Sequence, residues 1–228
     1  MEDIDAIAML QDPVRRRLYE YVVAQGREVG RNEAAEAIGV ARTLAAHHLD
    51  KLTEAGLLGS GSRRLSGRSG PGAGRPAKVY ARVRAEFAVS LPARDYRTAA
   101  ELLAEAAEEA GLDAGLRAAA RRRGEALRGP AAACGDLDEA ARLLAARGYE
   151  PHLEDEGDPE GVEAVTPVVR MRNCPFHAVA ERFPPLVCGM NLALLEGLLG
   201  ADGPVRARMD PRPGECCVVV ENSKTNVD

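Results

Sequence analysis

Three cysteines in the final third of the chain have the residue type and the separation of a metal or cluster site. Cys174 lies in the segment "NCPFH", Cys188 lies on an apolar, helical-looking stretch, and Cys216 precedes the last apolar run. Thiolates are the usual ligands of iron–sulfur clusters and of structural zinc. If the elements that carry them converge, Cys174, Cys188 and Cys216 form a three-thiolate site.

A fourth donor for that site has two candidates within the chain. Cys217 follows Cys216 directly, but adjacent residues of a strand point to opposite faces, so we expect only one of the two to serve. His177 is then the better candidate, and a ligand from outside the chain is another. Free cysteine also behaves as a small buried hydrophobe, so core packing is the alternative interpretation of the set, and the one we expect for Cys134.

The elements that must position these cysteines form a small α+β domain over residues 133–228. A helix is expected from about Asp136 to Arg147, and strands are indicated by "GYEPHLED", "VTPVVRMR" and "CCVVVE". A helix, "HAVAERFPPLVCGMNLALLEGLLG", lies between the last two strands. Because proline has no amide N–H for the helix interior, we expect this helix to break near Pro184–Pro185.

Residues 92–132 show an alanine-rich helical pattern. Apolar residues recur at helical spacing at Tyr96, Ala99, Leu103 and Ala107. One interpretation is that these helices join two copies of the chain, as half-sites one turn apart on DNA require. The other is that they pack on their own C-terminal domain. We predict a helical dimerisation linker.

The beginning of the chain has the pattern of a helix-turn-helix. Asp12 before Pro13 predicts a helix start, since the aspartate caps free amides and proline at the first position loses no hydrogen bond. Two further helices are expected at about 32–38 and 41–55, with a tight turn at Gly39 between them. Two helices joined by a short glycine-containing turn are typical of the helix-turn-helix.

The outer face of the third of these helices carries groups that suit a DNA groove. A small residue flanked by hydrogen-bond donors lets a helix lie deep in the major groove and contact base edges. His48 is expected on the opposite, inner side. The predicted DNA-reading face consists of Arg42, Thr43, Ala46, His47 and Lys51.

Two short strands, "GLL" and "KVYARV", with a long Gly, Ser, Pro and Arg segment between them, predict a hairpin wing that completes a domain over residues 1–84. These residues include 14 Lys or Arg and 10 Asp or Glu, net +4, whereas the rest of the chain has 16 and 25, net −9. Such asymmetry suits a polyanionic partner.

These residues resemble winged helix-turn-helix regulators related to the ArsR family. The segment "HHLDKLTEAGLL" matches the end of the recognition helix, and "GRPAKVY" matches the returning wing strand, over roughly residues 10–84. The resemblance implies double-stranded DNA as the partner. It also implies that basic wing residues contact phosphates or the minor groove, which gives affinity and salt dependence. The candidates are Arg63, Arg64, Arg68, Arg75 and Lys78.

Most of the chain also resembles iron–sulfur regulators of the SufR type, in which a winged helix-turn-helix precedes a "CP" motif, a helical cysteine and a third cysteine before the final strand. This resemblance implies that Cys174, Cys188 and Cys216 hold a cluster whose gain, loss or oxidation changes DNA binding. The doublet in "ECCVVV" and the histidine in "CPFH" depart from the pattern and leave the fourth ligand open.

Composition favours a cytoplasmic protein that is not an enzyme. Hydrophobic residues make up 46% and charged residues 29% of the chain, an ordinary balance for a folded protein. No basic and apolar leader or membrane-length apolar run is present, so no membrane partner is expected. Neither G-x-S-x-G nor H-E-x-x-H occurs. With 5 cysteines and a reducing compartment, a disulfide is not expected.

Together these observations predict an α+β protein with an N-terminal winged helix-turn-helix, a helical dimerisation linker and a small C-terminal sensor domain. We expect a homodimeric repressor that binds an iron–sulfur cluster and senses iron–sulfur or redox status. The alternative is a winged-helix regulator that responds to a small organic effector or to zinc, with cysteines that serve only packing.

Overall fold

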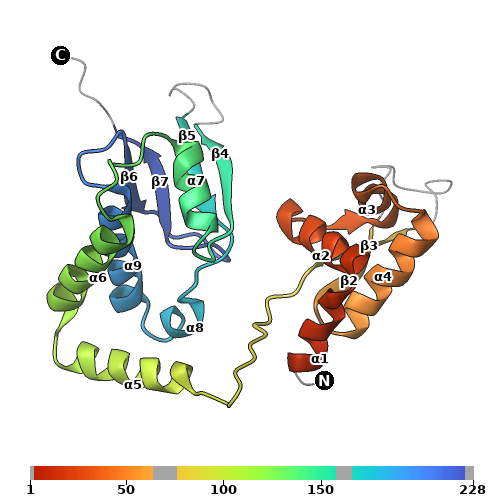
Figure 1. Cartoon of the computed structure of the whole chain (residues 1–228), viewed down its shortest axis with the longest axis horizontal. Helices are drawn as coiled ribbons and strands as arrows, with labels where there is room; N and C mark the ends of the chain where they lie inside the picture. The colour runs from red at the N-terminus through yellow and green to blue at the C-terminus, as the bar shows by residue number, and fades with distance from the viewer. Residues whose placement is uncertain (1–2, 64–75, 158–165, 224–228) are drawn as a thin grey trace. The chain divides into compact units, whose positions relative to one another are not determined.

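The computed structural model describes residues 3–63, 76–157 and 166–223. The chain divides into two compact units, Met1–Arg94 and Asp95–Asp228. Figure 1 colours the first from red to yellow and the second from yellow-green to blue. Each unit has its own hydrophobic core.

The first unit is a helical domain with a small antiparallel sheet of order β1-β3-β2. Local signals place its helix ends: the Asp12 carboxylate accepts a hydrogen bond from the Arg15 amide at 2.8 Å, and Gly26 and Gly39 end helices with φ of 61° and 71°. Its elements are α1 (Asp3–Ala8), the 3-10 helix η1 (Met9–Gln11), α2 (Pro13–Gln25), β1 (Val29–Gly30), α3 (Arg31–Ile38), α4 (Arg42–Glu54), β2 (Leu58–Arg63) and β3 (Ala77–Arg82).

The second unit has a four-stranded antiparallel sheet of order β4-β5-β7-β6. Alternate residues of β5 and β7, among them Val169 and Val220, face a core that also contains Leu144 of α7 and Leu198 of α9. Its elements are α5 (Tyr96–Glu109), α6 (Asp113–Arg128), α7 (Leu137–Ala145), β4 (Pro151–Glu156), β5 (Thr166–Met171), α8 (His177–Ala180), α9 (Pro184–Leu199), β6 (Val205–Met209) and β7 (Val218–Asn222).

The opposite face of this sheet is covered by ion pairs. Arg170 is completely buried there, and its guanidinium pairs with Glu154 at 3.2 Å and with Glu156 and Asp210. A buried charge is tolerated only when it is paired, so the three carboxylates make the burial of Arg170 possible.

Helices α6 and α9 cross at Gly124 and Gly197, where the backbone of each helix lies against the backbone of the other. A Cβ added to Gly124 would lie 2.1 Å from the Leu194 carbonyl oxygen, and one added to Gly197 would lie 2.2 Å from the Arg121 carbonyl oxygen. No side chain fits between the two helices at this crossing. The contact therefore fixes α9, which carries Cys188, against α6.

The predicted α+β class is confirmed, and so is the break near Pro184, where α8 and α9 are separate helices. Two strands, β1 and β6, were not predicted. Helices α5 and α6 belong to the second unit. Among the helices that the structure describes, none is long and apolar enough to cross a membrane.

Candidate nucleic-acid interface and cysteine site

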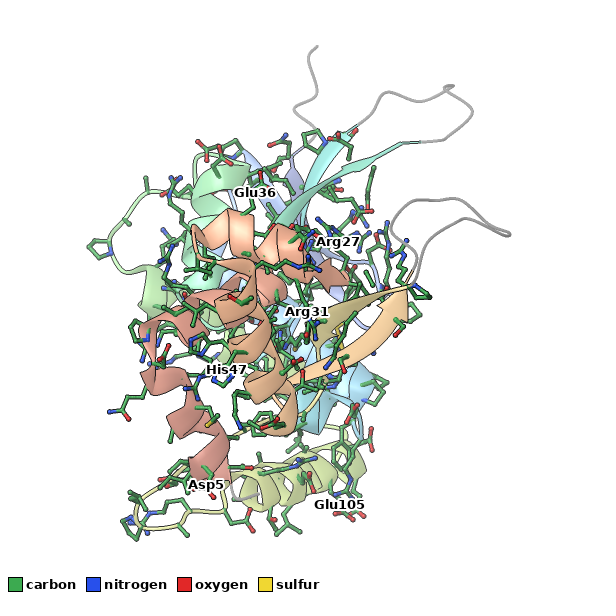
Figure 2. The ribbon with its side chains drawn as sticks, turned by 90° about the vertical axis from the view of Figure 1, so that its right-hand side faces the viewer. Asp5, Arg27, Arg31, Glu36, His47 and Glu105 are labelled. Atoms are coloured by element: carbon green, nitrogen blue, oxygen red, sulfur yellow. A yellow bond between two sulfur atoms is a disulfide. The ribbon has the colours of Figure 1, made fainter. Side chains whose placement is uncertain are left out.

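Helix α4 presents its predicted outer face to solvent. Arg42, Thr43 and His47 are exposed, and Ala46 and Lys51 are partly exposed. Figure 2 labels His47 on this helix. The inner side is formed by buried residues, including His48, which is only 8% exposed. The local helical pattern is sufficient to orient this helix because one side is almost wholly apolar.

Asp50, near the end of α4, is the centre of an ionic and hydrogen-bonded cluster that the sequence did not predict. Its carboxylate accepts hydrogen bonds from the Tyr80 hydroxyl at 2.6 Å and from the Lys78 ammonium at 2.7 Å, and it pairs with Arg31 at 3.3 Å. The Arg31 Nε also donates to the Tyr80 hydroxyl at 2.8 Å. We call these four residues the Asp50 cluster. It joins α3, α4 and β3.

The cluster shifts the titration of its members. Burial and the hydrogen bond to the Asp50 carboxylate raise the pKa of Tyr80 to about 12. Burial acts to raise the pKa of Asp50, but the hydrogen bonds from Lys78 and Tyr80 outweigh it and hold that pKa below its usual value. Asp50 is therefore ionised at neutral pH and keeps the wing strand attached to the recognition helix.

The predicted wing contacts are placed only in part. Lys78 is engaged with Asp50, and the exposed Arg63 pairs with Glu28 at 3.5 Å. Lys51 pairs with Glu54 at 2.7 Å. The exposed ion pairs of Arg63 and Lys51 contribute little stability, so these two cations can exchange their partners for phosphates. The other predicted wing residues, Arg64, Arg68 and Arg75, lie outside the described residues.

In the second unit, two of the predicted ligand cysteines contact each other. Cys174 follows β5 and is partly exposed, whereas Cys216 precedes β7 and is buried. Their thiols share a hydrogen bond, which lowers the pKa of Cys216 to about 7 against the opposing effect of burial. The same bond, together with burial, raises the pKa of Cys174.

A buried hydrogen-bond chain holds Cys216 from the other side. The Tyr149 hydroxyl donates to the Asn191 side-chain oxygen at 2.6 Å, and the Asn191 amide donates to the Cys216 sulfur at 3.4 Å. Tyr149 and Asn191 are 3% and 1% exposed. Neither residue was singled out from the sequence. The signal in the sequence for Asn191 is an asparagine on an apolar helical stretch, one turn after Cys188. A side-chain amide in such a place needs hydrogen-bond partners.

The other two cysteines of the site are bonded to each other. Cys188 of α9 and Cys217 form a disulfide, so the expectation of no disulfide is wrong for this structure. The predicted strand also begins later than expected, at Val218. Cys216 and Cys217 therefore precede the strand, where its alternation does not apply, and both pack against the same core.

The backbone amide of His177 donates to the Cys174 carbonyl oxygen at 3.0 Å, but its side chain has another partner. Its imidazole pairs with Glu181 at 3.1 Å, and both side chains are more than 60% exposed. Cys134 is buried in the core, and its thiol donates to the Asp136 carbonyl oxygen at 3.4 Å. Among the described residues, no group of three or more Cys, His, Asp or Glu side chains is arranged to hold a metal ion.

The donor set nevertheless has the chemistry of a cluster or zinc site. Cys174 contacts Cys216, and Cys188 is bonded to the next residue, Cys217, so the predicted ligands come from three segments to one region. The disulfide occupies two of the four sulfurs. Reduction of this bond gives two thiols, which join the free thiols of Cys174 and Cys216 to make four, and three of these four match the predicted ligand set.

The cysteine-bearing segment packs directly on α5. Ala104 of α5 shares a hydrophobic cluster with Phe183, Leu186 and Val187, the residues that lead to Cys188. Glu101 of the same helix pairs with Arg182. Figure 1 shows α5 beside α8. A structural change in the segment that leads to Cys188 would therefore act on α5 through direct contacts.

A sequence model of a helix-turn-helix domain matches residues 10–59, from η1 to the beginning of β2. No curated protein and no solved structure matches the chain significantly. The matched domain, with its exposed α4 face, makes this chain a DNA-binding transcription regulator.

Proposed function

We propose that this DNA-binding regulator is a homodimeric repressor whose DNA affinity is set by the state of its cysteine site, and that the site holds an iron–sulfur cluster. The observation that carries the proposal is that Cys174 contacts Cys216, while Cys217, the residue after Cys216, is bonded to Cys188 of α9. The resemblance to iron–sulfur regulators supports the same ligand set. Cys217 and His177 are the candidates for a fourth ligand.

The chain's own residues would couple the site to DNA. Asn191 and Tyr149 hold Cys216, while the glycine crossing holds α9 on α6. The residues between Cys174 and Cys188 pack on α5, which begins at the boundary with the DNA-binding unit. A cluster would supply a bound group that ties the three segments together when present. Its loss would leave the segments free to rearrange against α5.

The test is anaerobic purification followed by the visible absorption spectrum, with iron and acid-labile sulfide counted per chain. Charge-transfer absorption that disappears in Cys174→Ser, Cys188→Ser and Cys216→Ser variants is the expected result. A colourless protein after reconstitution would contradict cluster binding. Zinc in that preparation would indicate a zinc site, and a metal-free protein would indicate a small organic effector.

A second candidate function is thiol-based redox sensing, which the Cys188–Cys217 disulfide favours. Two molecules of a low-molecular-weight thiol would reduce this bond, giving two protein thiols and the disulfide of the reductant. The reduced and oxidised forms would then differ in DNA affinity without any metal. Metal-free protein whose DNA affinity changes between reductant and oxidant supports this candidate, and an unchanged affinity would contradict it.

A further inference from the structure

The four neighbouring cysteines of the second unit are in two oxidation states. Cys188 and Cys217 are bonded to each other, whereas Cys174 and Cys216 are free thiols. A hydrogen bond joins the two free thiols, so their sulfur atoms are in direct contact. The site therefore holds one disulfide and one pair of thiols that touch.

Backbone hydrogen bonds hold the two free thiols next to each other. The Cys216 amide donates to the carbonyl oxygen of Met171, the last residue of β5, at 2.9 Å. The Cys174 carbonyl oxygen accepts a hydrogen bond from the His177 amide at 3.0 Å. Because both backbones are held, a bond between the two sulfurs requires rotation of the side chains and no large displacement of either segment.

The two thiols differ in access to solvent and in their hydrogen bonds. Cys174 is partly exposed, whereas Cys216 is only 2% exposed. The Asn191 side-chain amide donates to the Cys216 sulfur at 3.4 Å, and the backbone amides of Cys217 and Val218 donate to the same sulfur. These donors keep the Cys216 sulfur beside Cys174. An accessible thiol with a second thiol fixed next to it is typical of cysteine pairs that sense oxidants.

We propose that Cys174 and Cys216 form a second disulfide of this site, and that a hydroperoxide is the oxidant that makes it. Cys174 reacts first because it is the thiol that the oxidant can reach, and Cys216 completes the bond. The Cys188–Cys217 disulfide takes no part in the reaction. The proposal rests on the proposed function only in placing this pair of thiols within the regulatory site.

The reaction takes place in two balanced steps. In the first, the Cys174 sulfur attacks the terminal oxygen of the hydroperoxide. A sulfur–oxygen bond forms, the oxygen–oxygen bond breaks, and the thiol proton leaves with the other oxygen as an alcohol, or as water when the oxidant is hydrogen peroxide. In the second, the Cys216 sulfur attacks the resulting sulfenic acid, a sulfur–sulfur bond forms, and the hydroxyl group leaves with the Cys216 proton as water. Two thiols are oxidised, and one hydroperoxide is reduced.

A second disulfide would close the site to metal. Cys174 and Cys216 are two of the three predicted ligands, and the third, Cys188, is already bonded. With both bonds formed, none of the four neighbouring cysteines remains a thiol. Hydroperoxide treatment should therefore prevent the assembly of a cluster until a thiol reductant opens both bonds.

The test uses the full chain, freed of metal by a chelator, with hydrogen peroxide as the oxidant. After the remaining thiols are alkylated, the unreduced protein is cleaved with trypsin, and its peptides are identified by mass spectrometry. Cleavage after Arg and Lys places Cys174 on residues 173–182, Cys188 on 183–206, and both Cys216 and Cys217 on 209–224. We expect the last of these peptides to be linked to the second before treatment and to both others after it. Recovery of the first peptide with an alkylated Cys174 after treatment would overturn the proposal.

Three variants assign the bond and the order of its formation. In the double variant Cys188→Ser, Cys217→Ser, a link between the first and the last peptide can only join Cys174 to Cys216. Cys216→Ser should lose the link and accumulate the sulfenic acid of Cys174, which dimedone traps. Cys134→Ser removes a buried thiol outside the pair and is the matched control, which should form the link in wild-type yield. A link of wild-type yield in Cys216→Ser would contradict the assignment.

The DNA affinity of the same samples separates this inference from the proposed function. A complete link with an unchanged Kd contradicts control of DNA binding by the site and supports the second disulfide. A Kd that changes without the link contradicts the second disulfide alone.

Discussion

Each unit of the molecule organises its functional residues around a buried tyrosine, but the two arrangements differ in charge and in solvent access. Tyr80 donates to the ionised Asp50, whose side chain is 38% exposed. Lys78 and Arg31 pair with the same carboxylate. Tyr149 donates to the neutral, fully buried Asn191, which in turn holds Cys216. The first arrangement lies at the surface, where it can adjust to a polyanion. The second keeps a cysteine in a fixed place.

The largest effect on stability is expected at the glycine crossing of α6 and α9, where the second unit has no space for a side chain. Gly197→Ala should destabilise it by about 3 kcal/mol or more, because the new Cβ would meet the backbone of α6 rather than a flexible side chain. Gly115→Ala, on α6 in open space, is the matched control and should be neutral or stabilising by up to about 1 kcal/mol. Hydrogen exchange followed by mass spectrometry measures each unit separately. Equal effects of the two variants would contradict the close crossing.

The two tyrosines can be compared directly by removal of their hydroxyls. Tyr149→Phe leaves the Asn191 oxygen buried without a donor and should cost about 2 kcal/mol in the second unit. Tyr80→Phe leaves Asp50 with Lys78, Arg31 and water, so its cost to the first unit should be about 1 kcal/mol or less. Urea denaturation with hydrogen exchange per unit provides the measurement. A larger cost for Tyr80→Phe would reverse the distinction between the two arrangements.

How far the sequence predicted these regions depends on how local their signals are. Asp12 and Gly39 mark helix ends by their own chemistry, so the helix-turn-helix was placed correctly. The Asp50 cluster joins residues on three elements, and no local pattern marks them. The same holds for the Cys188–Cys217 disulfide, which depends on where α9 packs. Strand β6 was missed because its five residues alternate arginines with small or apolar residues in a polar setting.

Salt dependence distinguishes free from engaged cations in the DNA-binding unit. Arg42 has no acidic partner among the described residues, so Arg42→Ala should weaken DNA binding roughly tenfold and lower the salt slope by about 1. Lys78→Ala should change the slope less, since Asp50 already holds the Lys78 ammonium. Fluorescence anisotropy at several salt concentrations gives both slopes. If Lys78→Ala lowers the slope as much as Arg42→Ala, Lys78 leaves Asp50 for phosphate.

The smallest expected effect is on the pH dependence of stability. Burial lowers the pKa of His48 in the first unit and of His152 in the second below the usual 6.5. As pH falls below 6.5, the unfolded chain takes up protons that the native histidines resist, so stability that is full above this pH declines. His48→Gln should remove the decline from the first unit alone. A decline of unchanged size in that unit would exclude His48 as its source.

The most direct measurement is the DNA affinity of one preparation in two states of the cysteine site, for the wild-type protein and for Cys188→Ser. The probe is a duplex selected by the protein from a random pool. Loss of the cluster or oxidation to the disulfide should change the wild-type Kd at least about tenfold, a coupling of about 1.4 kcal/mol. Cys188→Ser should show one Kd under both conditions. An unchanged wild-type Kd, or a fully responsive Cys188→Ser, would contradict control of DNA binding by this site.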